Sequence, residues 1–375
     1  MGENRGKKPT EKIKMMLCAV TAGRCEFEGC NKYLFEDNLT CELLNLSEVA
    51  HNIASSSAGP RGDIELSHKV SDDIENLLLL CRDHHKLVDN KPEIYTVEKL
   101  RAMKIKHERE IHRLCDLMCY PKCIVVKFQS PIKGKKQVII NQKEINSIVA
   151  KKFKPQEKYG PSIDVELSQE YNSKLFWDEA NKKIENEYTK MILPILDNNE
   201  VEHMAVFPLA PIPMIIKLGY LISDKIQVHV YQKRRSTNSW EWIDDSSEVE
   251  FIVNKNCKNQ DKVRKVALIL SISADIPLAR IPEDEDVFYQ ISVRKPDVEI
   301  IRSERDLTNF REKYISVLDQ IKKDYPEINV VDIFCAIPTS IAFEVGKSYM
   351  EGSHPKIRIY EYNDKFFETL IIGGK

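Results

Sequence analysis

The alternation of apolar and polar positions divides the chain into two regions. Beyond residue 160, strand-like apolar runs alternate with segments of helical periodicity. The strand-like runs are 226–232, 265–273, 286–293, 329–338 and 356–362; the helical segments are 168–192, 307–325 and 339–350, and 204–223 begins as a strand and becomes helical after Pro213. This order predicts parallel sheets, with ligand sites at the C-terminal ends of the strands.

Residues 1–120 instead combine short strand-like pieces, separated by polar turns, with one helix. Thr96 can cap this helix and Glu98 suits its positive end. An apolar stripe recurs at helical spacing at Leu100, Met103, His107, Ile111 and Leu114. A lysine-rich stretch with Pro and Gly at its ends follows. We therefore expect one domain at 1–125, a linker at 126–159 and a second domain at 160–375.

The composition is that of an ordinary globular protein, with 375 residues of which 42% are hydrophobic and 30% charged. The formal net charge is −2, so a surface for nucleic acid has to be a local patch. No apolar run approaches the roughly 20 residues that cross a bilayer, and the polar N-terminus lacks the apolar core of a signal peptide. We expect a cytoplasmic protein without membrane contact.

Eight of the ten cysteines precede residue 124, and without an export signal metal ligation explains them better than disulfides do. Four residues, including a glycine to turn the chain, separate Cys25 from Cys30, and two residues separate Cys81 from His84. These two pairs predict a tetrahedral Zn²⁺ site that stabilises the fold. Unliganded buried cysteines are the alternative.

Two histidines stand side by side at 84 and 85, and adjacent residues of a helix or strand point in different directions. If His84 faces zinc, His85 is free to hold a second, catalytic metal. Asn76 lies nine positions before His85, at the start of a strand, and His51 lies further upstream. Alone, His51 would be read as a core histidine, Asn76 as a strand cap and Arg61 as a solvated loop charge.

Five motifs together resemble an HNH endonuclease domain of the ββα-metal type: CEFEGC (25–30), EVAH (48–51), GPRGD (59–63), NLLLLC (76–81) and CRDHH (81–85). The resemblance implies hydrolysis of phosphodiester bonds in double-stranded DNA. It makes His51 the general base, a task that suits an imidazole near neutral pH, and has His85 hold a Mg²⁺ ion. Asn76 would either ligate this metal or fix the loop that carries His51, and Arg61 would pin a phosphate by bidentate hydrogen bonds.

One position departs from this family. Ala50 stands where many members carry a metal-binding Asp, Glu or His just before the base histidine. Glu48, Asp63 or water could supply the missing ligand. The departure keeps a second function open, that of a zinc-stapled scaffold or DNA-binding protein with an inactive nuclease core.

The second region resembles a SAVED domain in segments 207–242, 268–276 and 333–350. This resemblance implies two fused Rossmann-like modules related to CRISPR-associated sensors, and recognition of a cyclic oligonucleotide. HNH fused to SAVED is similar to the effector nucleases of bacterial cyclic-oligonucleotide anti-phage signalling (CBASS). We therefore expect a mixed α+β and α/β fold, with a zinc-stapled ββα-metal domain before the sensor.

Several residues of the second region suit a cyclic dinucleotide. Hydroxyl residues follow a buried strand, a helix start offers N–H groups to phosphate, and arginines and a tryptophan could meet phosphates and bases. The candidates are Ser271, Ser273, Pro338, Thr339, Ser340, Arg234, Arg235 and Trp240. Core burial is the alternative for Trp240, and a solvated hairpin for the arginines. The ligand would act by changing the packing of a homo-oligomer, a dimer to a tetramer. A restriction-type nuclease that reads modified bases is a third alternative.

Overall fold

The chain forms two compact units, residues 1–119 and 120–375, in the computed structural model. The structure describes residues 6–37, 39–133, 139–156, 160–198, 201–243, 248–258 and 263–374. Among these described residues, no helix is both long and apolar enough to cross a membrane.

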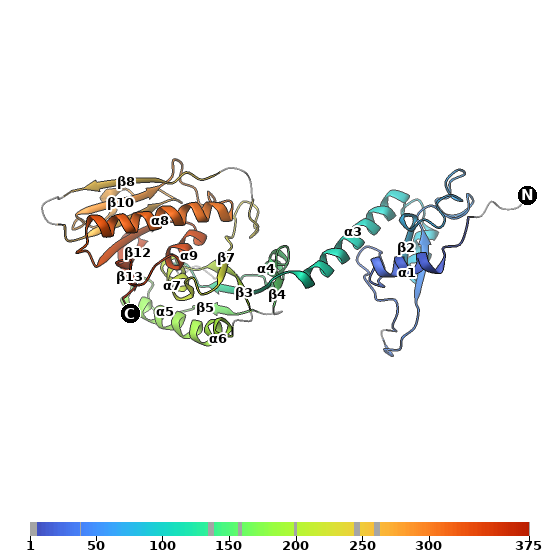
Figure 1. Cartoon of the computed structure of the whole chain (residues 1–375), viewed down its shortest axis with the longest axis horizontal. Helices are drawn as coiled ribbons and strands as arrows, with labels where there is room; N and C mark the ends of the chain where they lie inside the picture. Colours follow the sequence, from blue (N-terminus) through green and yellow to red (C-terminus); the bar gives the residue numbers. More distant parts are fainter. Residues whose placement is uncertain are drawn as a thin grey trace, which may run out of the picture. The chain divides into compact units, whose positions relative to one another are not determined.

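The first unit is an α+β lobe built around one antiparallel strand pair (Figure 1). Strand β1 (Ser47–His51) pairs with β2 (Leu77–Cys81), whose five side chains are all buried. Helix α2 (Arg82–Asn90) follows at once, and Cys81 is its N-cap residue. The remaining elements are α1 (Glu11–Val20), η1 (Ile74–Asn76), α3 (Val97–Asp116) and η2 (Leu117–Cys119).

Helix α3 begins where the sequence predicts. Thr96 Oγ1 accepts a hydrogen bond from the backbone N–H of Lys99 at 3.4 Å, and Glu98 lies in the first turn. Leu100 and Met103 of the predicted stripe are buried in the core of the lobe.

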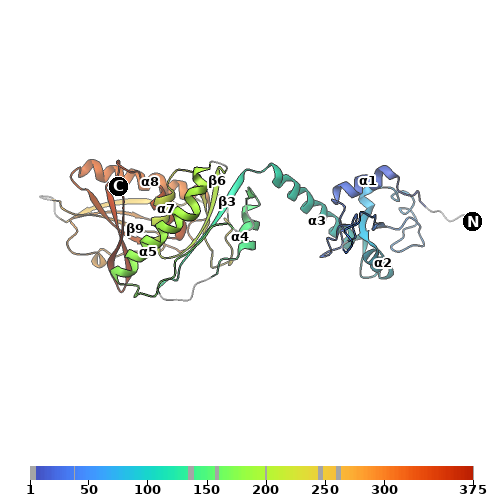
Figure 2. The ribbon, with the colours of Figure 1, turned by 90° about the horizontal axis from the view of Figure 1, so that it is seen from below.

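The second unit contains two sheets flanked by helices (Figure 2). All pairings of the first sheet are parallel, in the order β4-β3-β6-β7 with β5 beside β3. The second has the order β13-β12-β11-β9-β10-β8, with only the edge strands β8 and β13 antiparallel. The strands are β3 (Lys122–Gln129), β4 (Lys154–Pro155), β5 (Ser162–Asp164), β6 (His203–Leu209), β7 (Gln227–Val230), β8 (Ile252–Cys257), β9 (Val266–Ser271), β10 (Val287–Ser292), β11 (Val330–Ala336), β12 (Lys356–Asn363) and β13 (Lys365–Ile372). The helices are α4 (Gln142–Val149), α5 (Lys174–Glu187), α6 (Leu193–Asp197), α7 (Ile212–Ile222), α8 (Glu304–Asp324) and α9 (Thr339–Lys347), with the π-helical segment η3 (Tyr188–Ile192) and the 3-10 helix η4 (Leu278–Arg280).

These two sheets form two modules that share one strand order. The order β5-β3-β6-β7 of the first corresponds to β10-β9-β11-β12 of the second. The segments β6–α7 and β11–α9 also share three residue types, each pair 127 positions apart: Phe207 and Phe334, Pro211 and Pro338, Gly219 and Gly346. The predicted pair of fused Rossmann-like modules is thereby confirmed.

The shared glycines explain how α7 and α9 pack together. A Cβ added to Gly219 would stand 2.3 Å from the carbonyl oxygen of Phe343, and one added to Gly346 would stand 1.9 Å from that of Ile216. Only residues without a side chain allow the two backbones to approach this closely. The contact joins the two modules at equivalent points of each.

The predicted linker at 126–159 differs from the structure. Strand β3 lies inside the first sheet, and Ile145, Val149 and Phe153, in and after α4, are buried on one face of that sheet. Lysines at exposed positions, such as Lys143 and Lys151, obscured this apolar pattern in the sequence. Positions 134–138 and 157–159 lie outside the described residues. The described part of the segment belongs to the second unit.

Candidate active site

Four side chains of the first unit converge as a metal-binding group. The ligand atoms of Cys25, Cys30, Cys81 and His84 all lie within 4.8 Å of one another. His84 Nδ1 is 3.2 Å from Cys81 Sγ and 3.7 Å from Cys25 Sγ. Such separations fit donors arranged around one tetrahedral ion at about 2.0–2.3 Å. No second group of three or more such ligands occurs among the residues that the structure describes.

Local structure positions these ligands. Gly29, in the turn between Cys25 and Cys30, has φ +82°, which glycine adopts readily. The His84 ring stacks on Phe27, with 4.0 Å between centroids and 5° between planes. Burial raises the pKa of the Cys25 thiol to about 12, so the thiolate that binds metal needs a cation beside it.

His85 lies between two carboxylates rather than among the sulfur ligands. Its Nδ1 is 2.5 Å from Glu48 Oε2, and its Nε2 is 3.3 Å from Asp89 Oδ2, one turn further along α2. The hydrogen bond with Asp89 raises the pKa of His85, while burial opposes this shift and Glu48 adds to it. The negative surroundings that favour a proton on His85 also favour a metal cation there.

The acidic partners of His85 bear on the departure at Ala50. Ala50 is fully buried in the core of the lobe. Asp63 is used in a turn, where its Oδ1 accepts the N–H groups of Glu65 and Leu66 at 2.8 Å each. Of the candidates named from the sequence, Glu48 is therefore the residue that reaches His85. Asp89 was not predicted, although its i+4 spacing from His85 was a usable signal.

His51 ends strand β1 with a defined ring orientation. Its Nε2 lies 3.0 Å from the carbonyl oxygen of Ser71. A carbonyl oxygen can only accept, so Nε2 carries the proton, and a neutral ring then has its lone pair on Nδ1. This tautomer can accept a proton at Nδ1.

The structure corrects the prediction that Asn76 ligates a metal. Asn76 is 3% exposed. Its amide group donates to the carbonyls of Ile53 at 2.9 Å and Val70 at 3.1 Å, and its Oδ1 accepts the N–H of Ile53 at 2.9 Å. The side chain is therefore used in fixing the loop after His51, which was the other role considered for it.

The predicted phosphate contact of Arg61 is corrected in the same way. Its side chain is 4% exposed and pairs with Asp89 at 2.8 Å. It also donates to the backbone carbonyls of His51, Asn52 and Val88. A buried guanidinium with these partners does not offer two donors to a phosphate in solvent.

Four of the predicted ligand contacts in the second unit are buried with partners inside the protein. Arg234, 2% exposed, donates to the carbonyls of Ile301 and Glu299, and Trp240 packs edge-on against Phe207. The two others are serines: Ser271 Oγ accepts from Gln290 at 3.0 Å, and Ser340 Oγ donates to Gln232 at 2.6 Å. These side chains are therefore engaged inside the protein, where they offer no free group to a ligand.

The other candidates remain near strand ends. Ser273 follows β9 and donates its N–H to the carbonyl of Ala336, at the end of β11, at 2.7 Å. Pro338 and Thr339 begin α9, which has no side-chain cap, and Arg235 is exposed. A cavity of about 610 Å³ opens near the end of β10, with Arg294, Lys295 and Arg302 among its lining residues.

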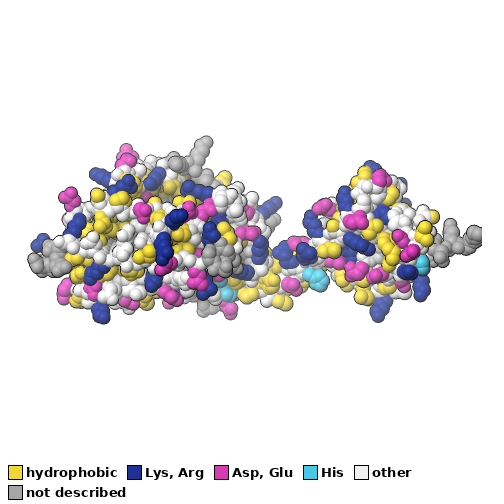
Figure 3. Space-filling view, turned by 90° about the horizontal axis from the view of Figure 1, so that it is seen from above, with side chains coloured by type: hydrophobic (Ala, Val, Ile, Leu, Met, Phe, Trp, Pro, Cys, Tyr) yellow, Lys and Arg dark blue, Asp and Glu magenta, His cyan; other side chains and the backbone are white. Residues whose placement is uncertain are grey.

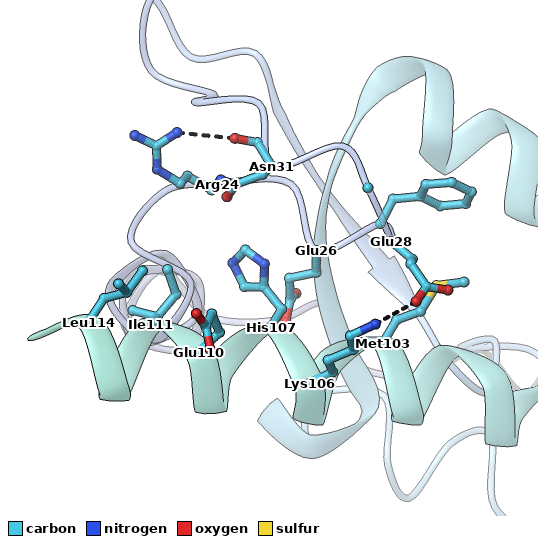
Figure 4. Close-up of a pocket in the computed structure, with 12 residues that line it drawn as sticks. Arg24, Glu26, Glu28, Asn31, Met103, Lys106, His107, Glu110, Ile111 and Leu114 are labelled. Carbon is cyan, nitrogen blue, oxygen red and sulfur yellow. Dashed lines mark hydrogen bonds and ion pairs between the residues drawn. The ribbon is translucent and has the colours of Figure 1, made fainter. Parts of the chain in front are cut away.

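The first unit also has a cavity of about 420 Å³ between α3 and the loop that bears the first cysteine pair (Figure 4). His107, Ile111 and Leu114 of the predicted stripe line it, together with Arg24 and Glu26. His51 and His85 do not line it, and neither do Glu48 and Asp89. This cavity is thus separate from the candidate chemistry.

Charged side chains of both signs are interspersed over the visible face of each unit (Figure 3). This matches the formal net charge of −2. In this view neither unit presents a broad basic surface, as expected from the composition.

Two family models match separate parts of the chain. The model described as "SMODS-associated and fused to various effectors sensor domain" (SAVED) matches residues 184–371, half of the chain. The model described as "HNH endonuclease" matches residues 18–91, which include every candidate residue from Cys25 to Asp89. The matches confirm the predicted HNH–SAVED combination. No protein of curated function matches the sequence.

Solved structures of similar fold include two Cap4 SAVED/CARF-domain containing receptors. One, from Acinetobacter baumannii with the cyclic trinucleotide 2'3'3'-cAAA, gives a TM-score of 0.43 at 12% identity over 78% of this chain and 62% of that chain. The other, from Moraxella osloensis, gives 0.41 at 13% identity over 77% of this chain and 58% of that chain. In both comparisons the match spans less than two thirds of the receptor.

Proposed function

Because the chain belongs to the SAVED family and carries an HNH endonuclease domain, we propose that it is a nuclease effector of CBASS-type anti-phage signalling. A cyclic oligonucleotide, for which a cyclic dinucleotide is our first candidate, binds the second unit. Its binding activates the first unit to cleave double-stranded DNA. One observation carries the nuclease assignment: Arg61 Nη2 contacts both the His51 carbonyl and the Asp89 carboxylate. The backbone of His51 and the acidic side of His85 are therefore adjacent.

His51 would take a proton from the attacking water at Nδ1, because Nε2 is committed to the Ser71 carbonyl. His85 Nε2 and Asp89 Oδ2 are 3.3 Å apart, close to the separation of roughly 3 Å between neighbouring ligands of an octahedral Mg²⁺ with bonds of about 2.0–2.1 Å. A Mg²⁺ held by them would stabilise negative charge on the phosphate and on the leaving oxygen. Glu48, at Nδ1, orients the His85 ring so that Nε2 faces that position.

The sulfur-rich group has a separate task. Cys25, Cys30, Cys81 and His84 suit a structural Zn²⁺ by donor type and spacing. Because His84 precedes His85 in the chain, ordering of the first site also fixes the start of α2 and the second site. Zinc binding and the active geometry should therefore be linked.

In the second unit, ligand binding is expected at the C-terminal ends of the parallel strands. Ser273, Thr339 and the uncapped start of α9 lie there, and α7 likewise begins without a side-chain cap. Free N–H groups at a helix start favour phosphate. Two modules of one design suit a ring of repeated nucleotides, and a ligand that prefers one packing of a homo-oligomer would shift the protein toward its active form.

The test is cleavage of supercoiled plasmid by the full chain, with and without Mg²⁺, against a panel of cyclic dinucleotides and trinucleotides. We expect cleavage only with Mg²⁺ and one class of ligand. His51→Ala should slow it about 10²–10⁴-fold, whereas His112→Ala, at an exposed position of α3, should not. Equal cleavage without any cyclic nucleotide would contradict the sensor role, and an active His51→Ala would contradict the base assignment.

A further inference from the structure

Arg61 joins the two segments that carry the candidate site. Its Nε and Nη2 donate to the carbonyls of Asn52 at 2.9 Å and His51 at 3.2 Å, at the end of β1. Its Nη1 donates to the carbonyl of Val88 at 2.7 Å, and Nη2 also pairs with Asp89 Oδ1 at 2.8 Å, near the end of α2. One planar group thus ties the segment of the base to the helix of the metal ligands.

The loop that presents Arg61 is closely fitted. Arg61 has φ +56°, a conformation that residues other than glycine adopt at a cost. A Cβ added to the next residue, Gly62, would stand 2.5 Å from the carbonyl oxygen of Ser57. The loop backbone therefore has little freedom to shift, and the guanidinium position follows from it.

The two oxygens of Asp89 have different partners. Oδ1 pairs with Arg61 at 2.8 Å, and Oδ2 lies 3.3 Å from His85 Nε2. A carboxylate held at one oxygen cannot rotate freely about its terminal bond, so the other oxygen keeps its direction. Outer groups that hold a ligand in this way commonly matter for metal affinity.

We infer that Arg61 is a positioning residue that fixes the direction of Asp89 Oδ2 toward the metal position and holds the His51 backbone beside it. The contribution of Arg61 to catalysis depends on the function proposed above. A lysine cannot take this role, because its ammonium is a single point of charge, whereas the four acceptors are arranged around a planar fork. If Arg61 merely stabilised the fold, its replacement would leave the metal affinity of the folded protein unchanged.

The first experiment is a calorimetric titration of Mn²⁺ into zinc-loaded full-length protein, in which Mn²⁺ probes the metal position beside His85 and Asp89. Arg61→Lys should bind Mn²⁺ about 10–100-fold more weakly than the wild type. Arg101→Lys, at an exposed position of α3, is the matched control and should stay within about twofold of it. Zinc content and the thermal midpoint report folding. Unchanged Mn²⁺ affinity in folded Arg61→Lys overturns the inference.

A second variant keeps the inference testable if Arg61→Lys does not fold. Asp89→Asn preserves size and should itself lose Mn²⁺ affinity by about tenfold or more; wild-type affinity in this variant overturns the inference. Where Arg61→Lys folds, the loss in Arg61→Lys/Asp89→Asn should match that of Asp89→Asn alone, since Arg61 acts on the metal position through Asp89, and full additivity contradicts the inference. Wild-type protein that binds Mn²⁺ as expected but never cleaves DNA would refute the proposed function and leave this inference standing.

Discussion

Replacing Asn76 by alanine should unfold the nuclease lobe locally without removing a metal ligand. The Asn76 amide makes three buried hydrogen bonds to the backbone, two with Ile53 and one with Val70. Alanine leaves one N–H and two carbonyl groups without these partners, in a position that is 3% exposed. The loop after His51 then loses both hydrogen bonds that join Ile53 to the Asn76 side chain, just before the strand that begins at residue 77.

The expected loss is about 3–4 kcal/mol. Each lost bond contributes roughly 1 kcal/mol net, and the backbone groups left unsatisfied in a buried position add to this. Water that enters the site can hydrogen-bond to some of these backbone groups. The total loss therefore stays below the sum of their full desolvation penalties. At 1.4 kcal/mol for each factor of ten, this loss corresponds to opening that is about 10²–10³-fold more frequent.

Hydrogen exchange followed by mass spectrometry measures this opening at the β1–β2 pair. Amides of β2 should exchange about 10²–10³-fold faster in Asn76→Ala than in the wild type. Asn90→Ala, at an exposed position of the same lobe, should change exchange little. Normal exchange in Asn76→Ala together with a tenfold loss of Mn²⁺ affinity would refute the reasoning, because Asn76 would then act at the metal.

Three further predictions concern packing, pH and metal. Gly346→Ala places a Cβ 1.9 Å from a carbonyl oxygen of α7 and should destabilise the second unit by about 3 kcal/mol, measured by tryptophan fluorescence during urea unfolding; a change below 0.5 kcal/mol would argue against the close crossing. Burial, with a contribution from Asp332, raises the pKa of Glu285 from 4.5 to about 8, so the free energy of unfolding should fall as pH rises through this window, where only the unfolded chain releases the proton. Glu285→Gln should remove this slope and be the more stable form at pH 8, by up to about 4 kcal/mol; identical pH profiles for the two proteins would contradict the assignment. Cys81→Ser, or a strong chelator, should release one zinc per chain and expose the β1–β2 amides to exchange, while an unchanged metal content after Cys81→Ser would exclude Cys81 as a ligand.

The sequence was most informative where function depends on local spacing. The metal-binding group consists of two pairs that are close in sequence, Cys25 with Cys30 and Cys81 with His84. Each pair could therefore be identified from its spacing before any fold was known. The alternation of strands and helices beyond residue 160 likewise predicted parallel sheets, because it reflects which faces are buried.

It was least informative where a polar side chain is buried by distant partners. Arg61 meets Asp89 across 28 positions of the chain, and Ser340 meets Gln232 across 108. Hydrophobic periodicity does not encode such pairs, so an arginine in a glycine-containing loop could only be read as exposed. Arg234 was misread for the same reason, since its partners are backbone carbonyls.

The central claim is that one small lobe holds two metals of different chemistry, a zinc among sulfur ligands and a harder ion beside His85. Diffraction from crystals of the full chain grown with Zn²⁺ and Mn²⁺, recorded at the absorption edge of each element, tests it directly. We predict a zinc peak amid Cys25, Cys30, Cys81 and His84, and a manganese peak bonded to His85 Nε2 and Asp89 Oδ2. A manganese peak elsewhere in the lobe, with His85 and Asp89 still bonded only to each other, would contradict the account.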